Sequence, residues 1–139
     1  MAPADPPVVH ELRHRAVPSL LDDAGVMLAG VWDAHADVDQ LDRAMVATAV
    51  AELVANIVAH GREASWATLS VEVKPTVIRA EVRDDGAALA ADVVEAATLP
   101  DDPLAESGRG LVVARDAVDE LRYERVGGEN RWTVVRHRR

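Results

Sequence analysis

The sequence predicts an α+β fold, a two-layer sandwich in which a mostly antiparallel sheet is covered on one face by helices. Two observations predict it. Segments of alternating apolar residues and segments of helical apolar spacing follow one another in the order β-α-α-β-β-(α)-α-β-β. Two pairs of predicted strands are joined only by short turns, around residues 74–76 and at Gly127-Gly128, and short turns join antiparallel strands.

The N-terminal part is predicted to hold one strand and two helices. Residues 10–16 alternate loosely and form a candidate edge strand. A helical pattern then covers residues 18–35. Asp37 or Asp39 is placed to cap a second helix, which continues through residue 59 and ends at Gly61.

After Gly61 the apolar period changes from helical to alternating, which predicts a hairpin, then helical segments, then a second hairpin. The predicted elements are strands at 66–73 and 77–82, a short helix at 87–98, a helix at 111–118, and strands at 120–125 and 131–136.

Length and composition limit the possible classes of protein. The 139 residues suit one domain with a single core, which we expect at residues 9–139, after a disordered segment at residues 1–8. The net charge of −9 argues against a direct nucleic-acid partner, and the absence of cysteine excludes disulfides and zinc–thiolate sites. Neither a membrane-spanning apolar run nor a signal-peptide pattern is visible, so we expect a cytoplasmic protein without membrane contact.

The helix predicted around residues 44–60 has four polar residues spaced four apart: Thr48, Glu52, Asn56 and His60, here called the polar stripe. A step of four residues drifts by only about 40° around a helix, so the four share one side. Since a buried polar group without a partner costs a few kcal/mol, this side faces solvent, a polar partner or a ligand cavity. A solvated side usually carries lysine, arginine and several glutamates, so the stripe favours a lined pocket.

Two further stretches carry chemistry. Asp84-Asp85-Gly86 follows a strand, where Asp-Gly is also a common turn pair. Gly108-Arg109-Gly110 precedes a helix, whose N-terminus with neighbouring glycines accommodates a phosphate, although the pattern also fits a flexible loop. A P-loop motif is absent and no dinucleotide-binding glycine motif follows a strand. The chain has only two asparagines, which favours a specific role for each of them.

Together these stretches resemble a known family. Glu52-Leu-Val-Ala-Asn56-Ile-Val-Ala-His60-Gly61 resembles the N box of the GHKL (Bergerat) ATP-binding fold, 84–86 its G1 box, and 107–111 its G2 box. The short chain is similar to the anti-sigma-factor serine/threonine kinase branch. The resemblance covers about residues 9–137 and implies a single histidine kinase-like ATP-binding domain.

The resemblance implies a role for each matching residue. Glu52 is the catalytic general base, and Asn56 holds Mg²⁺ through its amide oxygen. Asp84 accepts a hydrogen bond from the adenine amino group, Thr133 supports the adenine pocket, and residues 87–107 form the mobile ATP lid. The implied nucleotide-binding residues are Asn56, His60, Asp84, Gly86, Gly108, Arg109, Gly110 and Leu111.

The function implied by this resemblance is that of an ATP- and Mg²⁺-dependent protein serine/threonine kinase that is also an anti-sigma factor. Its partners would be an RNA polymerase sigma factor, held inactive, and an anti-anti-sigma (STAS-type) protein, phosphorylated on Ser or Thr. Homodimers are common in such families.

Two alternatives stay open. The G1 box commonly reads D-x-G-x-G, and the second glycine position is Ala88 here, so a nucleotide-binding interaction module with little or no kinase activity is possible. A detached histidine-kinase catalytic domain is the other alternative, and it requires a separate protein with a phosphoacceptor histidine.

Overall fold

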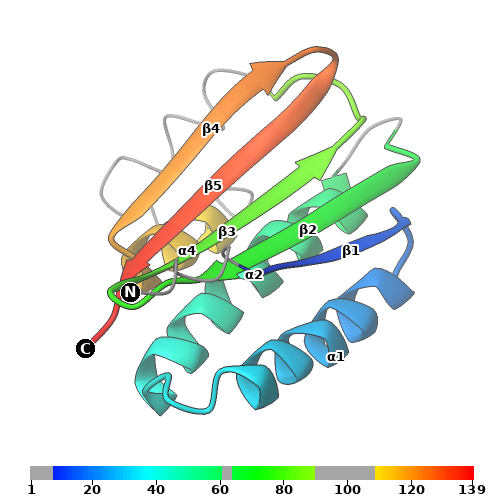
Figure 1. Ribbon diagram of the computed structural model, residues 1–139. Coiled ribbons are helices and arrows are strands. Elements are labelled where there is room, and N and C mark those ends of the chain that lie inside the picture. The colour runs from blue at the N-terminus through cyan, green and yellow to red at the C-terminus, as the bar shows by residue number, and fades with distance from the viewer. Residues whose placement is uncertain (1–7, 61–63, 90–108) are drawn as a thin grey trace.

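The computed structural model describes residues 8–60, 64–89 and 109–139, and these form one sheet with helices on one face (Figure 1). The strands are β1 (Val9–Arg15), β2 (Trp66–Val73), β3 (Val77–Asp84), β4 (Glu120–Val126) and β5 (Glu129–His137). The helices are α1 (Ser19–Ala34), α2 (Gln40–His60) and α4 (Arg109–Ala117). The predicted α+β sandwich is confirmed.

The sheet has the strand order β1-β2-β3-β5-β4, and every neighbouring pair is antiparallel. β1 is an edge strand, as predicted. The two hairpins predicted by the short turns are present, and Gly127 and Gly128 have φ values of 56° and 81°, which side-chain-bearing residues rarely adopt.

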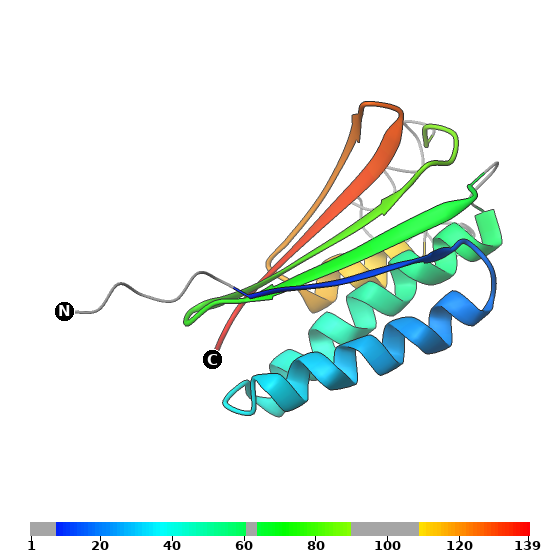
Figure 2. The ribbon, with the colours of Figure 1, turned by 45° about the vertical axis from the view of Figure 1, so that its right-hand side comes forward.

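The helices pack on one side of the sheet, with α2 between α1 and α4 (Figures 1 and 2). Alternate residues of each central strand point into this layer, among them Leu69, Ile78, Val82 and Val134, all nearly inaccessible to solvent. They meet the apolar sides of the helices, including Val50 and Leu53, in one core. This packing explains why α2 is apolar on most sides, since three neighbours surround it.

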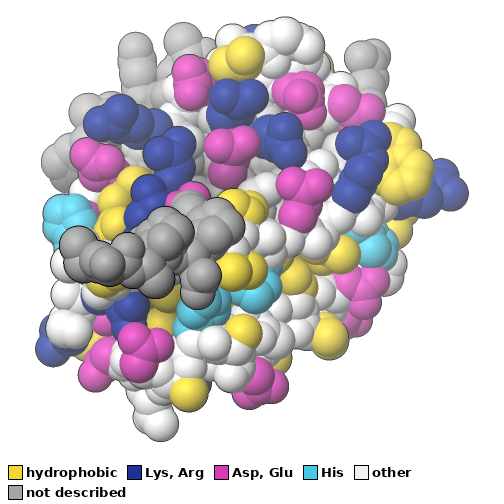
Figure 3. Space-filling view, in the orientation of Figure 1, with side chains coloured by type: hydrophobic (Ala, Val, Ile, Leu, Met, Phe, Trp, Pro, Cys, Tyr) yellow, Lys and Arg dark blue, Asp and Glu magenta, His cyan; other side chains and the backbone are white. Residues whose placement is uncertain are grey.

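The opposite face of the sheet is open and carries interspersed charges of both signs (Figure 3). Arg83 on β3 and Arg131 on β5 are paired in register there, and both approach Glu81, at 3.2 and 3.5 Å. This face therefore contributes a mixed charged surface rather than part of the core.

No helix in the described part of the chain combines the length and apolarity that crossing a membrane requires.

Helix boundaries agree with the sequence to within a few residues. Of the two predicted caps, Asp39 is the one observed, since its Oδ1 accepts a hydrogen bond from the Leu41 N–H at 2.8 Å. Asp37 instead pairs with Arg138 (2.9 Å). Residues 87–89 of the predicted helix at 87–98 are irregular, and the rest of that helix lies outside the described residues, as do Gly61 and residues 1–7.

Candidate functional site

Glu52, in the middle of the polar stripe of α2, lies against α4. The decisive position is Gly110 in the first turn of α4, where a Cβ atom would lie only 2.6 Å from Glu52 Oε2. The Glu52 carboxylate therefore lies directly against the α4 backbone, and glycine at position 110 makes this close approach possible. Because a helix N-terminus carries a partial positive charge, the contact places an anion-attracting helix end beside a carboxylate.

The other members of the stripe differ in their surroundings. Asn56, one turn after Glu52, is half-buried on the same side of α2. The Thr48 hydroxyl donates to the Ala44 carbonyl oxygen (2.8 Å), so the helix itself satisfies this group. His60 is the last residue of α2, and the role implied for its side chain stays a prediction.

The first turn of α4 holds most of the predicted G2 residues. Arg109 is exposed and begins the helix, whereas the Leu111 side chain is fully buried in the core. Leu111 can therefore reach a nucleotide only through its backbone. Gly108 lies outside the described residues.

Asp84, at the end of β3, is buried, with 4% of its surface exposed. Its Oδ1 accepts hydrogen bonds from the Gly86 N–H (2.9 Å) and from Asn130 Nδ2 (3.1 Å). In the described part of the chain both hydrogen bonds to Asp84 use this one oxygen. Oδ2 is thus the oxygen left for a ligand that donates a hydrogen bond.

Asn130, the second asparagine of the chain, organises this corner and was missed by sequence reasoning. Besides Asp84, its amide donates to the Ala87 carbonyl oxygen (2.8 Å), and its Oδ1 accepts from the Tyr123 hydroxyl and from Arg125 Nη1. Arg125 also donates to the Gly86 carbonyl oxygen at 2.6 Å. The β4–β5 hairpin therefore fixes the loop after β3. The rarity of asparagine was the only sequence signal for it.

Asp85 has a separate, structural task. Its Oδ1 accepts the backbone N–H groups of Ser65 (2.8 Å) and Trp66 (2.9 Å), which ties the loop after β3 to the start of β2. These hydrogen bonds, with that of Trp66 the stronger influence, hold the pKa of Asp85 below its ordinary value despite partial burial.

The predicted role of Thr133 is wrong. Asp84 lies opposite Asn130 in the β3–β5 register, and both point toward the helices. Thr133 is three residues from Asn130, so its side chain lies on the other face of the sheet, opposite Glu81. The strand period therefore excludes Thr133 from the side of the sheet on which Asp84 lies, and Asn130 occupies the position next to Asp84.

These groups come together at one end of the molecule. The C-terminal end of α2, the end of β3 and the N-terminal end of α4 all lie there, in both views of the ribbon (Figures 1 and 2). Segments far apart in sequence thus place the Glu52 carboxylate, the Asn56 amide, the buried Asp84 carboxylate and the α4 N-terminus at the same end of the molecule.

The sequence model of the histidine kinase-like ATPase domain matches residues 15–137. The chain belongs to this family. The match spans nearly all the described strands and helices, and the arrangement is that of a GHKL (Bergerat-type) domain. A search among curated protein sequences finds no match.

Among solved structures, the domain is similar to the crystal structure of the RsbU and RsbW domains of Rv1364c from Mycobacterium tuberculosis. The TM-score is 0.67 at 22% sequence identity, with 97% of this chain and 33% of that chain covered. The similarity supports the fold, and this chain spans about a third of the length of the crystallised chain.

Proposed function

We propose that this histidine kinase-like ATPase domain binds Mg·ATP and transfers its γ-phosphoryl group to a serine or threonine of a partner protein. The observation that carries the proposal is the Glu52 carboxylate of α2 lying against Gly110 in the first turn of α4. A general base beside a phosphate-attracting helix N-terminus is the pair of elements that phosphoryl transfer to a hydroxyl needs.

The residues present fit the nucleotide and the metal. Asp84 Oδ2 is the acceptor for the adenine amino group, because Gly86 and Asn130 already hold Oδ1. The half-buried Asn56 offers an amide oxygen, a ligand type that Mg²⁺ accepts. When bound, Mg²⁺ supplies neutralisation of phosphate charge.

Glu52 takes the proton in the proposed reaction. Its carboxylate accepts the proton of the attacking hydroxyl while the hydroxyl oxygen bonds to the γ-phosphorus and the bond to the β-phosphate oxygen breaks. Gly110 keeps the carboxylate free of a side-chain clash. Asn130, through Asp84 and Ala87, fixes the orientation of the base-binding corner.

The proposed partners follow from the resemblance of the three boxes to anti-sigma-factor kinases. They are a sigma factor that the protein sequesters and a STAS-type antagonist that it phosphorylates, with a homodimer as the proposed assembly. In support of this branch, the similar crystal structure from Mycobacterium tuberculosis contains a domain named RsbW.

The first test is calorimetric titration of Mg·ATP into wild type, Asn56→Ala and Thr48→Ala. Thr48 is the matched control, since it belongs to the same stripe but its hydroxyl is satisfied within the helix. We expect saturable binding by wild type and Thr48→Ala, and loss of binding or of its Mg²⁺ dependence in Asn56→Ala. Wild type that is folded but does not bind would refute the proposal.

The second test separates the kinase from an interaction module, which Ala88 at a usual glycine position favours. Glu52→Gln is assayed for transfer of labelled phosphate to a candidate antagonist and for nucleotide binding. Loss of transfer with retained binding supports the kinase. If wild type and Glu52→Gln regulate the partner equally well, the interaction module is favoured. If the label on the acceptor protein is acid-labile, the acceptor is a histidine, as in the histidine-kinase alternative.

A further inference from the structure

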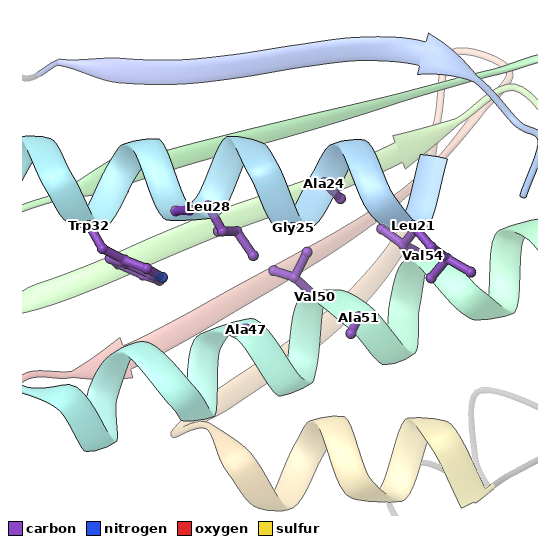
Figure 4. A pocket seen from close by; sticks show the side chains of 10 residues that line it. Leu21, Ala24, Gly25, Leu28, Trp32, Ala47, Val50, Ala51 and Val54 are labelled. Carbon is purple, nitrogen blue, oxygen red and sulfur yellow. The ribbon is translucent and has the colours of Figure 1, made fainter. Parts of the chain in front are cut away.

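A second surface lies on the other side of α2, toward α1. The two helices enclose a groove of about 280 Å³ lined only by apolar or small residues. Larger side chains such as Leu21, Leu28, Trp32 and Val54 border it, with Gly25 at its centre (Figure 4). Gly25, Ala29 and Ala51 are exposed, so the groove opens to solvent.

The groove is separate from the nucleotide site. Ala47, Val50, Ala51 and Val54 line it, whereas Glu52 belongs to the side of α2 that meets α4. On α1 the lining runs from residue 21 to residue 32, which is about 16 Å, or three helical turns. A shallow apolar channel of this length between two helices fits one side of a third helix.

Acidic residues outnumber basic ones beside the groove. From residue 16 to residue 42 the chain has six aspartates and no lysine or arginine. Arg43, one turn before Ala47 on α2, donates to the carbonyl oxygens of Ala36 and Val38, both at 2.9 Å. Most of these acids are engaged elsewhere: Asp23 pairs with His14 (2.7 Å), and Asp42 pairs with Arg136. Asp22 and Asp33 are exposed on α1, three residues before Gly25 and four after Ala29, which places them beside the groove.

We propose that this groove, with Asp22 and Asp33 at its rim, docks a basic amphipathic helix of a partner protein. The apolar side of that helix would occupy the space over Gly25 and Ala51. Its Lys or Arg residues would meet Asp22 and Asp33, which are eleven residues apart on α1. The small side chains of the floor permit close approach, and the acidic rim selects against an acidic helix.

The chain offers a matched pair of variants. A Cβ atom at Gly25 or at Gly30 meets no heavy atom within 4 Å, so both accept a longer side chain. Replacing a helical glycine also favours the helix, so folding is preserved. The two positions differ by about 140° around α1, so Gly25→Gln fills the groove whereas Gly30→Gln does not.

The test measures binding of a fluorescent 18-residue Leu/Lys amphipathic peptide by anisotropy, without nucleotide. Comparison peptides are a Leu/Glu version and a scrambled Leu/Lys version. We expect Gly25→Gln to weaken binding by about tenfold or more and Gly30→Gln to leave it nearly unchanged. Asp22→Asn with Asp33→Asn should weaken binding and reduce its salt dependence, whereas Glu124→Gln on the sheet should not.

Several results would overturn the proposal: equal effects of the two glycine variants, equal binding of the Leu/Glu peptide, or no binding of the Leu/Lys peptide. Analytical ultracentrifugation of the protein without peptide provides a further test. If wild type is a dimer and Gly25→Gln is a monomer, the groove is occupied by a second copy of this chain and the proposal is wrong. Since Asn56→Ala should bind the peptide normally, failure of the nucleotide proposal is distinguishable from failure of this one.

Discussion

Two buried aspartates, which contact opposite ends of β5, differ in how many of their carboxylate oxygens are hydrogen-bonded. We call the end at Asp42 the closed end and the end at Asp84 the open end. Asp42, in the first turn of α2, is fully buried, and both of its oxygens are used: Oδ1 by Arg136 Nε (3.0 Å) and Oδ2 by the Arg139 N–H (2.9 Å). Asp84 is almost as buried, but its side-chain partner is the neutral amide of Asn130, and the hydrogen bonds of the described residues leave Oδ2 free.

Both partners come from the helix-facing side of β5, six residues apart. A carboxylate paired with guanidinium and fully hydrogen-bonded is closed to ligands and stabilises the fold. A buried carboxylate held by an amide through one oxygen leaves its other oxygen as an acceptor, which suits ligand binding. The comparison predicts that variants at the Asp42 end alter stability alone, whereas variants at the Asp84 end alter nucleotide binding, with or without an effect on stability.

The largest expected effect belongs to the closed end. Arg136→Met leaves Asp42 buried without its counterion and frees the Ala117 carbonyl oxygen, so we expect a loss of about 3–5 kcal/mol in the free energy of unfolding. Urea denaturation measures it. The exposed Arg122–Glu120 pair is the control, and Arg122→Met should cost about 1 kcal/mol or less. Equal costs would contradict the assignment.

Acid should weaken the same end. Burial raises the pKa of Asp42, but the Arg139 N–H and the Arg136 guanidinium outweigh burial and lower the pKa below its usual value. The unfolded chain then binds more protons, so the contribution is complete above about pH 4 and is lost as pH falls through the lowered pKa. The urea concentration at the midpoint of unfolding should therefore decrease as the pH is lowered below about 4. The decrease should be smaller in Arg136→Met than in wild type. A flat wild-type profile would contradict this.

At the open end, Asn130→Leu removes hydrogen bonds to Asp84, Ala87 and Tyr123 together. We expect a loss of about 2–3 kcal/mol, because buried polar groups lose their partners, together with weakened nucleotide binding. Unfolding and calorimetry on the same sample measure both. Tyr123→Phe removes one hydroxyl from the network. It should reduce the free energy of unfolding and the nucleotide affinity by less than Asn130→Leu does.

Asp84→Asn should separate binding from stability. The amide oxygen still accepts from Gly86 and Asn130, so the free energy of unfolding should change by about 1 kcal/mol or less. Nucleotide affinity should fall by about tenfold or more, since the substitution replaces a carboxylate oxygen by an amide group at the acceptor position. If the variant instead unfolds as readily as Arg136→Met, the two aspartates have the same structural task and the comparison fails.

The smallest effect on stability is expected for Gly110→Ala. The new Cβ would displace only the end of the flexible Glu52 side chain, and alanine favours the helix, so stability should change by about 1 kcal/mol or less. Phosphoryl transfer should slow by about tenfold, because the base is moved. Gly30→Ala, in open space, is the control and should leave transfer unchanged.

Much of this molecule was predictable from local pattern. The alternating and helical periods predicted all five strands and the three described helices, because each period reports which side of an element meets the core. The four-residue spacing of the polar stripe likewise put Glu52 and Asn56 on one side of α2. The three boxes predicted the family to which the chain belongs.

The tertiary structure decided which residues meet across those elements. Asn130 and Thr133 are both buried residues of β5, although the predicted strand began only at residue 131. The β3–β5 register shows that Asn130 lies beside Asp84 while Thr133 lies on the other face. The Arg136–Asp42 pair joins residues 94 positions apart, and the groove exists only where α1 and α2 pack. Sequence fixes periodicity along one element, but pairings between elements depend on register and packing, which no local pattern encodes.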